Sequence, residues 1–327
     1  MLATYNFSIK GRSHKKSEKP CQDCSAIVDI SPAWKCVIVA DGVGNCKKSE
    51  IASKIAVETV TEVITKGFPK NGTDRDYQSL LLTAGHFAAN SIESYVEKND
   101  AGNEQEYHTT LAMAICSKNS TYYFSVGDSG IIALNEENAQ WERVTKQDND
   151  SIGNVYTLQF RDHYKVGKIN FKPAVVLAVT DGIYNECFPL ALINEKFKCK
   201  VPFLNFLATY AFGLTEEDAE TATKEQVENI KKYLESEECQ HMTDDLSVAA
   251  VINSETCLEE EDILYEAPDW YAVYWKSLEN KPYDEENKIK NFENFIKENN
   301  TEFSDEEVKK FAEKYIKSNG KTDENKE

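Results

Sequence analysis

The stretch Cys36-Val-Ile-Val-Ala-Asp-Gly-Val-Gly44 joins a continuous apolar run to an aspartate and a glycine-rich turn. A short apolar run that ends in turn residues predicts a buried strand. Asp41 stands where this strand ends, and the same junction recurs at Asp181, which follows the apolar run Val175–Val179. Asp128 follows a third predicted strand in the same way. Carboxylates at strand ends, although far apart in the sequence, can meet at one end of a sheet.

Further carboxylates stand at the beginnings of predicted strands. Asp244 and Asp245 directly precede the apolar run 246–252, and Asp23 precedes a strand candidate that starts at Cys24. Gathered carboxylates repel one another and raise one another's pKa unless a cation neutralises them. Hard divalent cations such as Mg²⁺ or Mn²⁺ take oxygen ligands of this kind. Aspartate before glycine is also ordinary turn chemistry, so the metal hypothesis depends on the whole set.

Length and composition bound the class of protein. The chain has 327 residues, of which 41% are hydrophobic, and it carries a net charge of −19. A length near 300 residues favours about two domains, and the acidity excludes sequence-independent nucleic-acid binding. No apolar run is long enough to span a membrane, and the first residues lack a signal-peptide pattern. We therefore expect a cytoplasmic protein.

The nine cysteines indicate neither a disulfide framework nor a zinc site. An odd number in a chain of this length argues against a complete set of disulfides. The single Cys-x-x-Cys, Cys21-Gln-Asp-Cys24, has no second pair at a spacing typical of zinc fingers. We interpret these thiols as buried or incidental.

Apolar spacing predicts a mixed α/β core. Residues 49–66 and 78–97 have the helical period, with Ser49 as the cap of the first helix and Gly67 at its end. The remaining apolar runs are short and bounded by turn residues, which predicts strands at 109–116, 121–126, 131–134, 175–179 and 246–252.

The composition changes near Ser254, which predicts two domains, 1–254 and 255–327. Residues 255–327 contain 21 acidic and 11 basic side chains, a net charge of −10. Apolar stripes at helical spacing predict that this extension is mostly helical, and Ser304-Asp-Glu-Glu307 has the spacing of a capping box. The extension either docks on the first domain or binds a partner.

Six short motifs occur in a characteristic order and together resemble one known family. They are Ser8-Ile-Lys-Gly11 with Gln22-Asp23, Asp41-Gly-Val-Gly44, His108-Thr-Thr-Leu111, Val126-Gly-Asp-Ser129, Val179-Thr-Asp-Gly182 and Thr243-Asp-Asp-Leu-Ser-Val248. With these motifs the sequence resembles the metal-dependent protein phosphatases of type 2C (PPM). Ser13-His14, together with Gln22-Asp23, makes it most similar to the bacterial-style members. The motifs extend over residues 8–252. Each motif is weak alone, and their number and order carry the resemblance.

The resemblance implies an α+β fold, a four-layer α-β-β-α sandwich of two antiparallel sheets flanked by helix pairs, with the acidic helical extension added at the C-terminus. It implies hydrolysis of phosphoserine and phosphothreonine in a phosphoprotein substrate, opposite a serine/threonine kinase. It also implies two Mn²⁺ or Mg²⁺ ions, and a weak third, with a metal-bridged hydroxide attacking phosphorus in line. No protein nucleophile is needed in this scheme.

The resemblance also implies roles for individual residues. Asp41 would bridge two metals, and the carbonyl of Gly42 would bind one of them. The other implied metal residues are Asp181 and Asp244 as ligands, Asp23 as a ligand or a holder of metal-bound waters, and Asp128 beside the third site.

Several positions depart from the family pattern. Gln22 replaces a glutamate, Glu18 stands where many members have a phosphate-clamping arginine, and Asn185 occupies the place of a third-metal aspartate. Val43 falls where other members have a general-acid histidine, so either His14 or a metal-bound water is predicted to serve instead, and His14 is the predicted catalytic residue. The nearby basic substitutes for the arginine are Arg12, His14, Lys16 and Lys19, of which Arg12 and Lys19 are the predicted phosphate ligands.

Two other functions remain to be weighed. A catalytically idle pseudophosphatase would bind a phosphoprotein or another partner through this domain and the acidic extension, and the departures at Gln22, Glu18 and Asn185 favour it. A calcium sensor is disfavoured because the sequence contains no EF-hand loop.

Overall fold

The computed structural model describes most of the first three quarters of the chain and short pieces of the rest. The described residues are 2–137, 141–149, 154–187, 219–237 and 239–256, with 193–194, 199–200, 287, 290–294 and 309. The chain divides into two compact units, Met1–Cys187 with Leu204–Tyr265, and Phe188–Phe203 with Glu266–Glu327. The first unit contains both large sheets. In the second, two short strands pair, β10 (Ile193–Asn194) and β11 (Cys199–Lys200).

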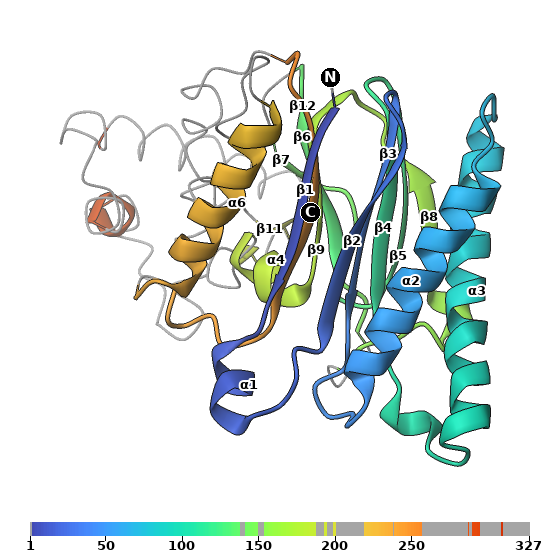
Figure 1. The fold of residues 1–327 in the computed structure, drawn as a ribbon. Coiled ribbons are helices and arrows are strands. Elements are labelled where there is room, and N and C mark those ends of the chain that lie inside the picture. Colours follow the sequence, from blue (N-terminus) through green and yellow to red (C-terminus); the bar gives the residue numbers. More distant parts are fainter. Residues whose placement is uncertain are drawn as a thin grey trace, which may run out of the picture. The chain divides into compact units, whose positions relative to one another are not determined.

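Two five-stranded sheets form the centre of the first unit (Figure 1). The first sheet has the order β1 (Leu2–Ile9), β12 (Leu246–Asn253), β9 (Pro173–Val179), β6 (Gly130–Asn135) and β7 (Trp141–Arg143). The second has the order β2 (Asp23–Ser31), β3 (Trp34–Asp41), β4 (Leu111–Cys116), β5 (Thr121–Val126) and β8 (Lys165–Lys168). All neighbouring strands are antiparallel.

Helices cover the outer face of each sheet (Figure 1). The pair α2 (Ser49–Gly67) and α3 (Asp74–Asn99) packs on the second sheet, and α6 (Ala219–Glu235) with α4 (Asp181–Cys187) packs on the first. The short α1 (Arg12–Ser17) joins β1 to β2, and two 3-10 turns lie at Glu104–Glu106 and Arg161–His163. The predicted four-layer α-β-β-α sandwich is confirmed.

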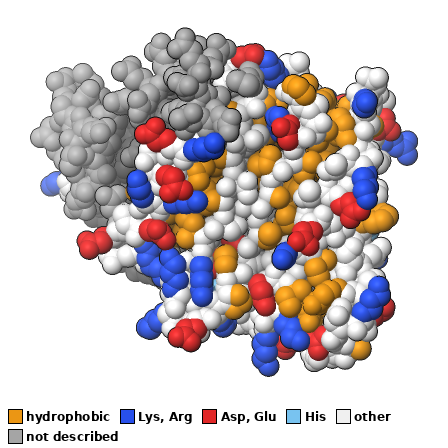
Figure 2. Space-filling view, in the orientation of Figure 1, with side chains coloured by type: hydrophobic (Ala, Val, Ile, Leu, Met, Phe, Trp, Pro, Cys, Tyr) orange, Lys and Arg blue, Asp and Glu red, His pale blue; other side chains and the backbone are white. Residues whose placement is uncertain are grey.

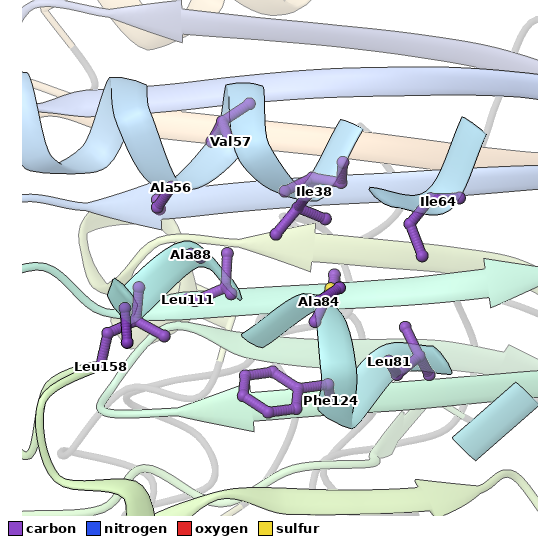
Figure 3. Close-up of a cluster of buried hydrophobic side chains, with 14 of the residues drawn as sticks. Ile38, Ala56, Val57, Ile64, Leu81, Ala84, Ala88, Leu111, Phe124 and Leu158 are labelled. Carbon is purple, nitrogen blue, oxygen red and sulfur yellow. The ribbon is translucent and has the colours of Figure 1, made fainter. Parts of the chain in front are cut away.

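Strand β3 is buried on both of its faces, which explains its continuous apolar sequence. Cys36, Ile38 and Ala40 belong to the core beneath α2 and α3, part of which Figure 3 shows. The alternate residues Val37 and Val39 belong to a second core between the two sheets. Because neighbouring side chains on a strand point to opposite faces, each core receives every second residue of β3.

The helix ends differ from the sequence prediction. Ser49 is the first residue of α2 rather than its cap, and its hydroxyl contacts the carbonyl of Cys46 and the side-chain amide of Gln22 instead. At the other end Gly67 is still helical. Helix α3 begins four residues earlier than predicted because Thr73 and Asp76 form a reciprocal capping box, with Asp in the position where Glu or Gln is usual.

The predicted C-terminal extension lies largely outside the described residues. Residues 290–294 are helical, as the apolar stripe predicts. The other stripe, the capping box at 304–307 and the proposed domain boundary at Ser254 remain predictions. A search of the described residues for membrane-spanning helices finds none that is long and apolar enough.

Gly85 on α3 permits close contact with the second sheet. A Cβ atom at this position would lie 2.6 Å from Cζ of Phe124 on β5. We expect Gly85→Ala to lower the free energy of unfolding by about 1–2 kcal/mol, because overpacking outweighs the gain in helix propensity. Chemical denaturation measures this. In a Phe124→Leu background the same substitution should be neutral or stabilising, and a stabilised Gly85→Ala single variant would contradict the packing described here.

Candidate metal centre

Two aspartates face each other at one end of the second sheet. Asp23 begins β2 and is the register partner of Asp41, the last residue of β3. The hydroxyl of Thr180, which follows β9 in the other sheet, donates a hydrogen bond of 2.8 Å to Oδ2 of Asp23. Thr180 also accepts a bond from the backbone N–H of Ser247, at 3.0 Å. This hydroxyl therefore connects the ends of the two sheets at the carboxylates.

The register of the first sheet brings three more aspartates to the same end. Val179, the last residue of β9, pairs with Gly130 at the beginning of β6 and with Val248 near the beginning of β12. The residues just beyond these positions therefore leave the sheet at the same end of its strands, the lower end in Figure 1. They include Asp128, Asp181 and Asp244.

Uncharged groups fix the backbone of Asp41. Its carbonyl accepts bonds of 2.8 Å from the hydroxyl of Thr109 and from the backbone N–H of Thr110. Its own N–H donates to Oγ1 of Thr110 at 3.2 Å. The same Thr110 hydroxyl lies 2.7 Å from Oγ of Ser129, which is the neighbour of Asp128. The His108-Thr-Thr motif thus positions Asp41 relative to Asp128.

Gly42 lies where backbones approach too closely for a side chain. A Cβ atom there would lie 2.7 Å from the backbone of Ser49 and 2.8 Å from the carbonyl oxygen of Gln22. The Gly42 N–H donates to that same carbonyl at 3.1 Å. The glycine after Asp41 is therefore required by this contact, which links the loop after β3 to the segment before β2.

Burial and mutual repulsion raise the pKa values of the gathered carboxyls. Burial raises the pKa of Asp41 well above its usual range, and the charges of Asp23, Asp181 and Asp128 raise it further. Burial likewise raises the pKa of Asp23, against the lowering effect of its bond from Thr180. Burial and then Asp181 raise the pKa of Asp128 to about 7. For Asp181, burial and then Asp244 are the main causes of a raised pKa.

These carboxylates fit divalent cations. In the described part of the chain, none of the five pairs with a Lys, Arg or His side chain. One buried oxygen of Asp23 and one of Asp181 have no hydrogen-bond partner. No three His, Cys, Asp or Glu side chains among the described residues already form a group arranged to hold a metal. The five carboxyls are thus an open set of oxygen donors, and either protons or a divalent cation would neutralise their charges.

A sixth aspartate, Asp245, organises the segment that leads to the site. It is only 2% exposed. One carboxylate oxygen accepts the N–H of Gly11 at 2.6 Å, and the other accepts the N–H of Gln22 at 2.6 Å and contacts Nδ1 of His14 at 2.9 Å. Asp245 therefore holds both ends of the connection 11–22, and its neighbour Asp244 stays exposed.

The structure gives Arg12 a different role from the predicted one. Its Nη1 group donates to the carbonyls of Cys239 and Met242, and its Nη2 group to those of Leu234 and Ser236. All four Nη–H groups are therefore occupied, at the end of α6. This arrangement corrects the prediction that Arg12 binds phosphate and makes it a structural residue instead.

Three other predicted or divergent positions have distinct surroundings. His14 is buried on Asp245, whereas Lys19 is exposed and donates a bond of 3.1 Å to the carbonyl of Gly44, in the loop that follows Asp41. The side-chain amide of Gln22 donates to the carbonyl of Cys46 at 3.0 Å, so it braces that loop.

Sequence reasoning missed the roles of Thr180 and Asp245. Asp244 and Asp245 are adjacent and identical in type, but the side chain of Asp245 is buried and that of Asp244 is exposed. No periodic pattern in the sequence distinguishes the two. Thr180 is part of a quoted motif, and a hydroxyl directly before a strand-end aspartate is the only signal that could have identified it.

A family comparison accounts for the sandwich with carboxylates at one end of its strands. The model of the protein phosphatase 2C family matches residues 10–255. The chain therefore belongs to this family, whose phosphatases use divalent metals. A search of curated protein sequences finds no match.

Solved structures share the fold at low sequence identity. A bacterial serine phosphatase bearing an R161E mutation is 15% identical, with a TM-score of 0.56 over 77% of this chain and 99% of its own. Stp1 from Staphylococcus aureus is 14% identical, with a TM-score of 0.53 over 77% and 95%. The serine/threonine phosphatase of S. agalactiae is 12% identical, with a TM-score of 0.53 over 77% and 99%. At these identities the likeness establishes the fold.

The raised pKa of Asp128 predicts how stability depends on pH without metal. The folded chain holds a proton on Asp128 up to about pH 7, whereas the unfolded chain loses it near pH 4. The folded state therefore binds more protons between these values, and stability falls as pH rises through this window. In EDTA, we expect Asp128→Asn to exceed wild type in free energy of unfolding by about 1–3 kcal/mol at about pH 8, with little difference at about pH 4.

Metal should reverse this effect, because it binds the ionised carboxylates. Mn²⁺ at about a hundred times its dissociation constant stabilises a one-site protein by about 2.7 kcal/mol. Thermal denaturation with Mn²⁺ and with EDTA, over the same pH series, measures both effects. Equal curves for wild type and Asp128→Asn at all pH values would contradict the clustering of charge around Asp128.

Proposed function

We propose that the chain is a serine/threonine phosphoprotein phosphatase. The observation that carries this proposal is the set Asp23, Asp41, Asp128, Asp181 and Asp244, which both sheets contribute at one edge and no basic side chain of the described residues neutralises. Membership of the protein phosphatase 2C family supports the same reaction.

The chain's own residues would hold two Mn²⁺ or Mg²⁺ ions, with a weaker third site beside Asp128. Asp41 would be a ligand of both ions and the carbonyl of Gly42 a ligand of one, with Asp181 and Asp244 on the other ion and Asp23 on an ion or its waters. Such ions, when bound, acidify a water for in-line attack on phosphorus and screen the phosphate's charge. The protein holds Asp41 through bonds to its backbone, and one carboxylate oxygen of Asp23 and one of Asp181 have no hydrogen-bond partner.

Two further residues have proposed roles near the phosphate. Lys19 is exposed next to the loop after Asp41 and carries no carboxylate partner among the described residues, so we propose that it binds phosphate as a point charge. His14 is only 7% exposed and its Nδ1 is bonded to Asp245. We propose that its catalytic contribution is to hold the connection 11–22 in place, in contrast to the predicted proton transfer.

The alternative is a pseudophosphatase that binds a phosphoprotein without turnover. Gln22 favours it, because an amide committed to Cys46 and Ser49 replaces a carboxylate of the family. Asn185 adds to this, since its side-chain oxygen accepts a bond from Gln147 at 3.0 Å. The intact set of five aspartates favours the active enzyme.

The proposal extends to the setting of the reaction. Phosphoprotein substrates place the enzyme opposite a serine/threonine kinase, and the acidic residues 255–327 offer a region for a further partner. Seven cysteines of the described residues are free (Cys21, Cys24, Cys36, Cys46, Cys116, Cys187 and Cys239), which supports a reducing compartment such as the cytoplasm.

Asp181→Asn tests the proposed activity. The substitution keeps the shape of the side chain but removes the negative charge through which a carboxylate binds a divalent cation. We expect kcat on p-nitrophenyl phosphate and on a phosphothreonine peptide to fall by about 10²-fold or more, consistent with the several kcal/mol that a metal supplies. Wild type should be active with Mn²⁺ or Mg²⁺ and inactive in EDTA.

Controls separate the site from the fold. Asp29→Asn, an exposed aspartate of β2, should retain wild-type turnover. Lys19→Gln should raise KM more than it lowers kcat. Unchanged turnover in Asp181→Asn would contradict the assigned site, and no turnover by folded, metal-loaded wild type would favour the pseudophosphatase.

A further inference from the structure

A short basic segment interrupts a strongly acidic chain. Residues 10–19 contain five basic side chains, Lys10, Arg12, Lys15, Lys16 and Lys19, against one acidic side chain, Glu18. The whole chain has a net charge of −19. This local reversal of charge falls on α1 and the turn after it, between β1 and β2.

The structure places this segment beside the candidate metal centre. Asp245 holds its beginning through Gly11 and its end through Gln22. Lys19 bonds the carbonyl of Gly44 at 3.1 Å, and Lys47 belongs to the same loop between β3 and α2. Figure 2 shows several Lys and Arg side chains, with Asp and Glu side chains among them, along the lower edge of the molecule, where Figure 1 places α1 and this loop.

Two lysines of the basic segment and one of the loop after β3 are available to a ligand. Lys16, Lys19 and Lys47, here called the entrance lysines, are exposed, and none forms an ion pair within the described residues. By contrast, Arg12 is bound to backbone carbonyls, and Lys15 pairs with Glu235 at 3.0 Å. The entrance lysines therefore present positive charge that the protein itself does not neutralise.

We propose that the entrance lysines select phosphopeptides with acidic residues next to the phosphorylated side chain. This inference rests on the proposed phosphatase function and adds a substrate class to it. A peptide with its phosphate at the carboxylate edge would pass α1 or the loop after β3. Acidic residues there would pair with Lys16 and Lys47, and basic residues would meet like charge.

The nearby acidic groups do not cancel this effect. Glu18 is the one carboxylate within the basic segment, and Glu106 accepts the backbone N–H of Lys47 at 2.8 Å. Over residues 10–19 and 42–48 together, seven Lys and Arg side chains stand against the single carboxylate of Glu18. Because the rest of the chain is acidic, the entrance lysines provide the local attraction that a negatively charged peptide needs.

The test compares two phosphothreonine peptides of equal length, one with Asp or Glu and one with Lys at the flanking positions. Both kcat/KM and binding are measured, binding by fluorescence anisotropy of labelled peptides, with p-nitrophenyl phosphate as a substrate that lacks flanking residues. We expect wild type to prefer the acidic peptide by about tenfold at about 0.05 M salt. The preference should shrink at about 0.5 M salt, because surface charges are screened.

The decisive variant is the double substitution Lys16→Gln with Lys47→Gln. We expect kcat/KM for the acidic peptide to fall about threefold to tenfold, as two exposed ion pairs are lost, with hydrolysis of p-nitrophenyl phosphate unchanged. The matched control is Lys70→Gln with Arg75→Gln, which removes the same charge from two exposed positions, one on the connection between α2 and α3 and one in the first turn of α3. It should keep the wild-type preference.

The outcomes separate this inference from the proposed function. Hydrolysis of p-nitrophenyl phosphate without a peptide preference, or an equal loss for both peptides in the double variant, would overturn the role of the entrance lysines alone. If no substrate is hydrolysed, the anisotropy comparison still decides: tighter binding of the acidic peptide that the double variant abolishes supports the inference, and equal binding of both peptides overturns it.

Discussion

The burial of β3 on both faces is the constraint on which the rest of the structure depends. A strand between two cores must be apolar wherever both of its faces are buried, because an unpaired polar side chain there would be costly. Lys35, near the start of β3, is buried but pairs with Asp29, and from Cys36 to Ala40 the strand is apolar. The next polar side chain is Asp41, where the strand leaves the sandwich. The same reasoning applies to β9, also fully buried, which is followed by Thr180 and Asp181. The fold itself thus brings carboxylates to its edge.

The hydrogen-bond partners of the gathered aspartates indicate why so much negative charge lies in one place. A purely structural cluster would be expected to include Lys or Arg partners, because buried charges are usually paired. Here the hydroxyl of Thr180 donates to the carboxylate of Asp23, and the hydroxyl of Thr110 accepts the backbone N–H of Asp41, so neither support neutralises a charge. Positive charge occurs instead on the neighbouring surface of α1. The five aspartates at the strand ends, with the entrance lysines nearby, are the arrangement that the proposed function requires: the aspartates bind cations, and a phosphate then binds beside them.

The sequence predicts the periodic parts of the fold and the identity of the gathered aspartates, because burial on a strand or helix leaves a regular pattern. It does not predict interactions that irregular connections create. Arg12 is an example, since its four carbonyl partners come from residues more than two hundred positions away. Serine is a residue type that often caps helices, but the hydroxyl of Ser49 accepts a hydrogen bond from the side-chain amide of Gln22 instead. Which member of the Asp244–Asp245 pair points inward is likewise decided by packing against Gly11 and His14.

Direct counting of bound Mn²⁺ tests the central claim most simply. Equilibrium dialysis of the full chain, with free Mn²⁺ followed by electron paramagnetic resonance, gives the number of ions for each protein molecule. We expect wild type to bind two ions and Asp41→Asn to lose at least one of them, with the far-ultraviolet circular dichroism unchanged. Wild-type protein that is folded and binds no Mn²⁺ at millimolar concentration would contradict it.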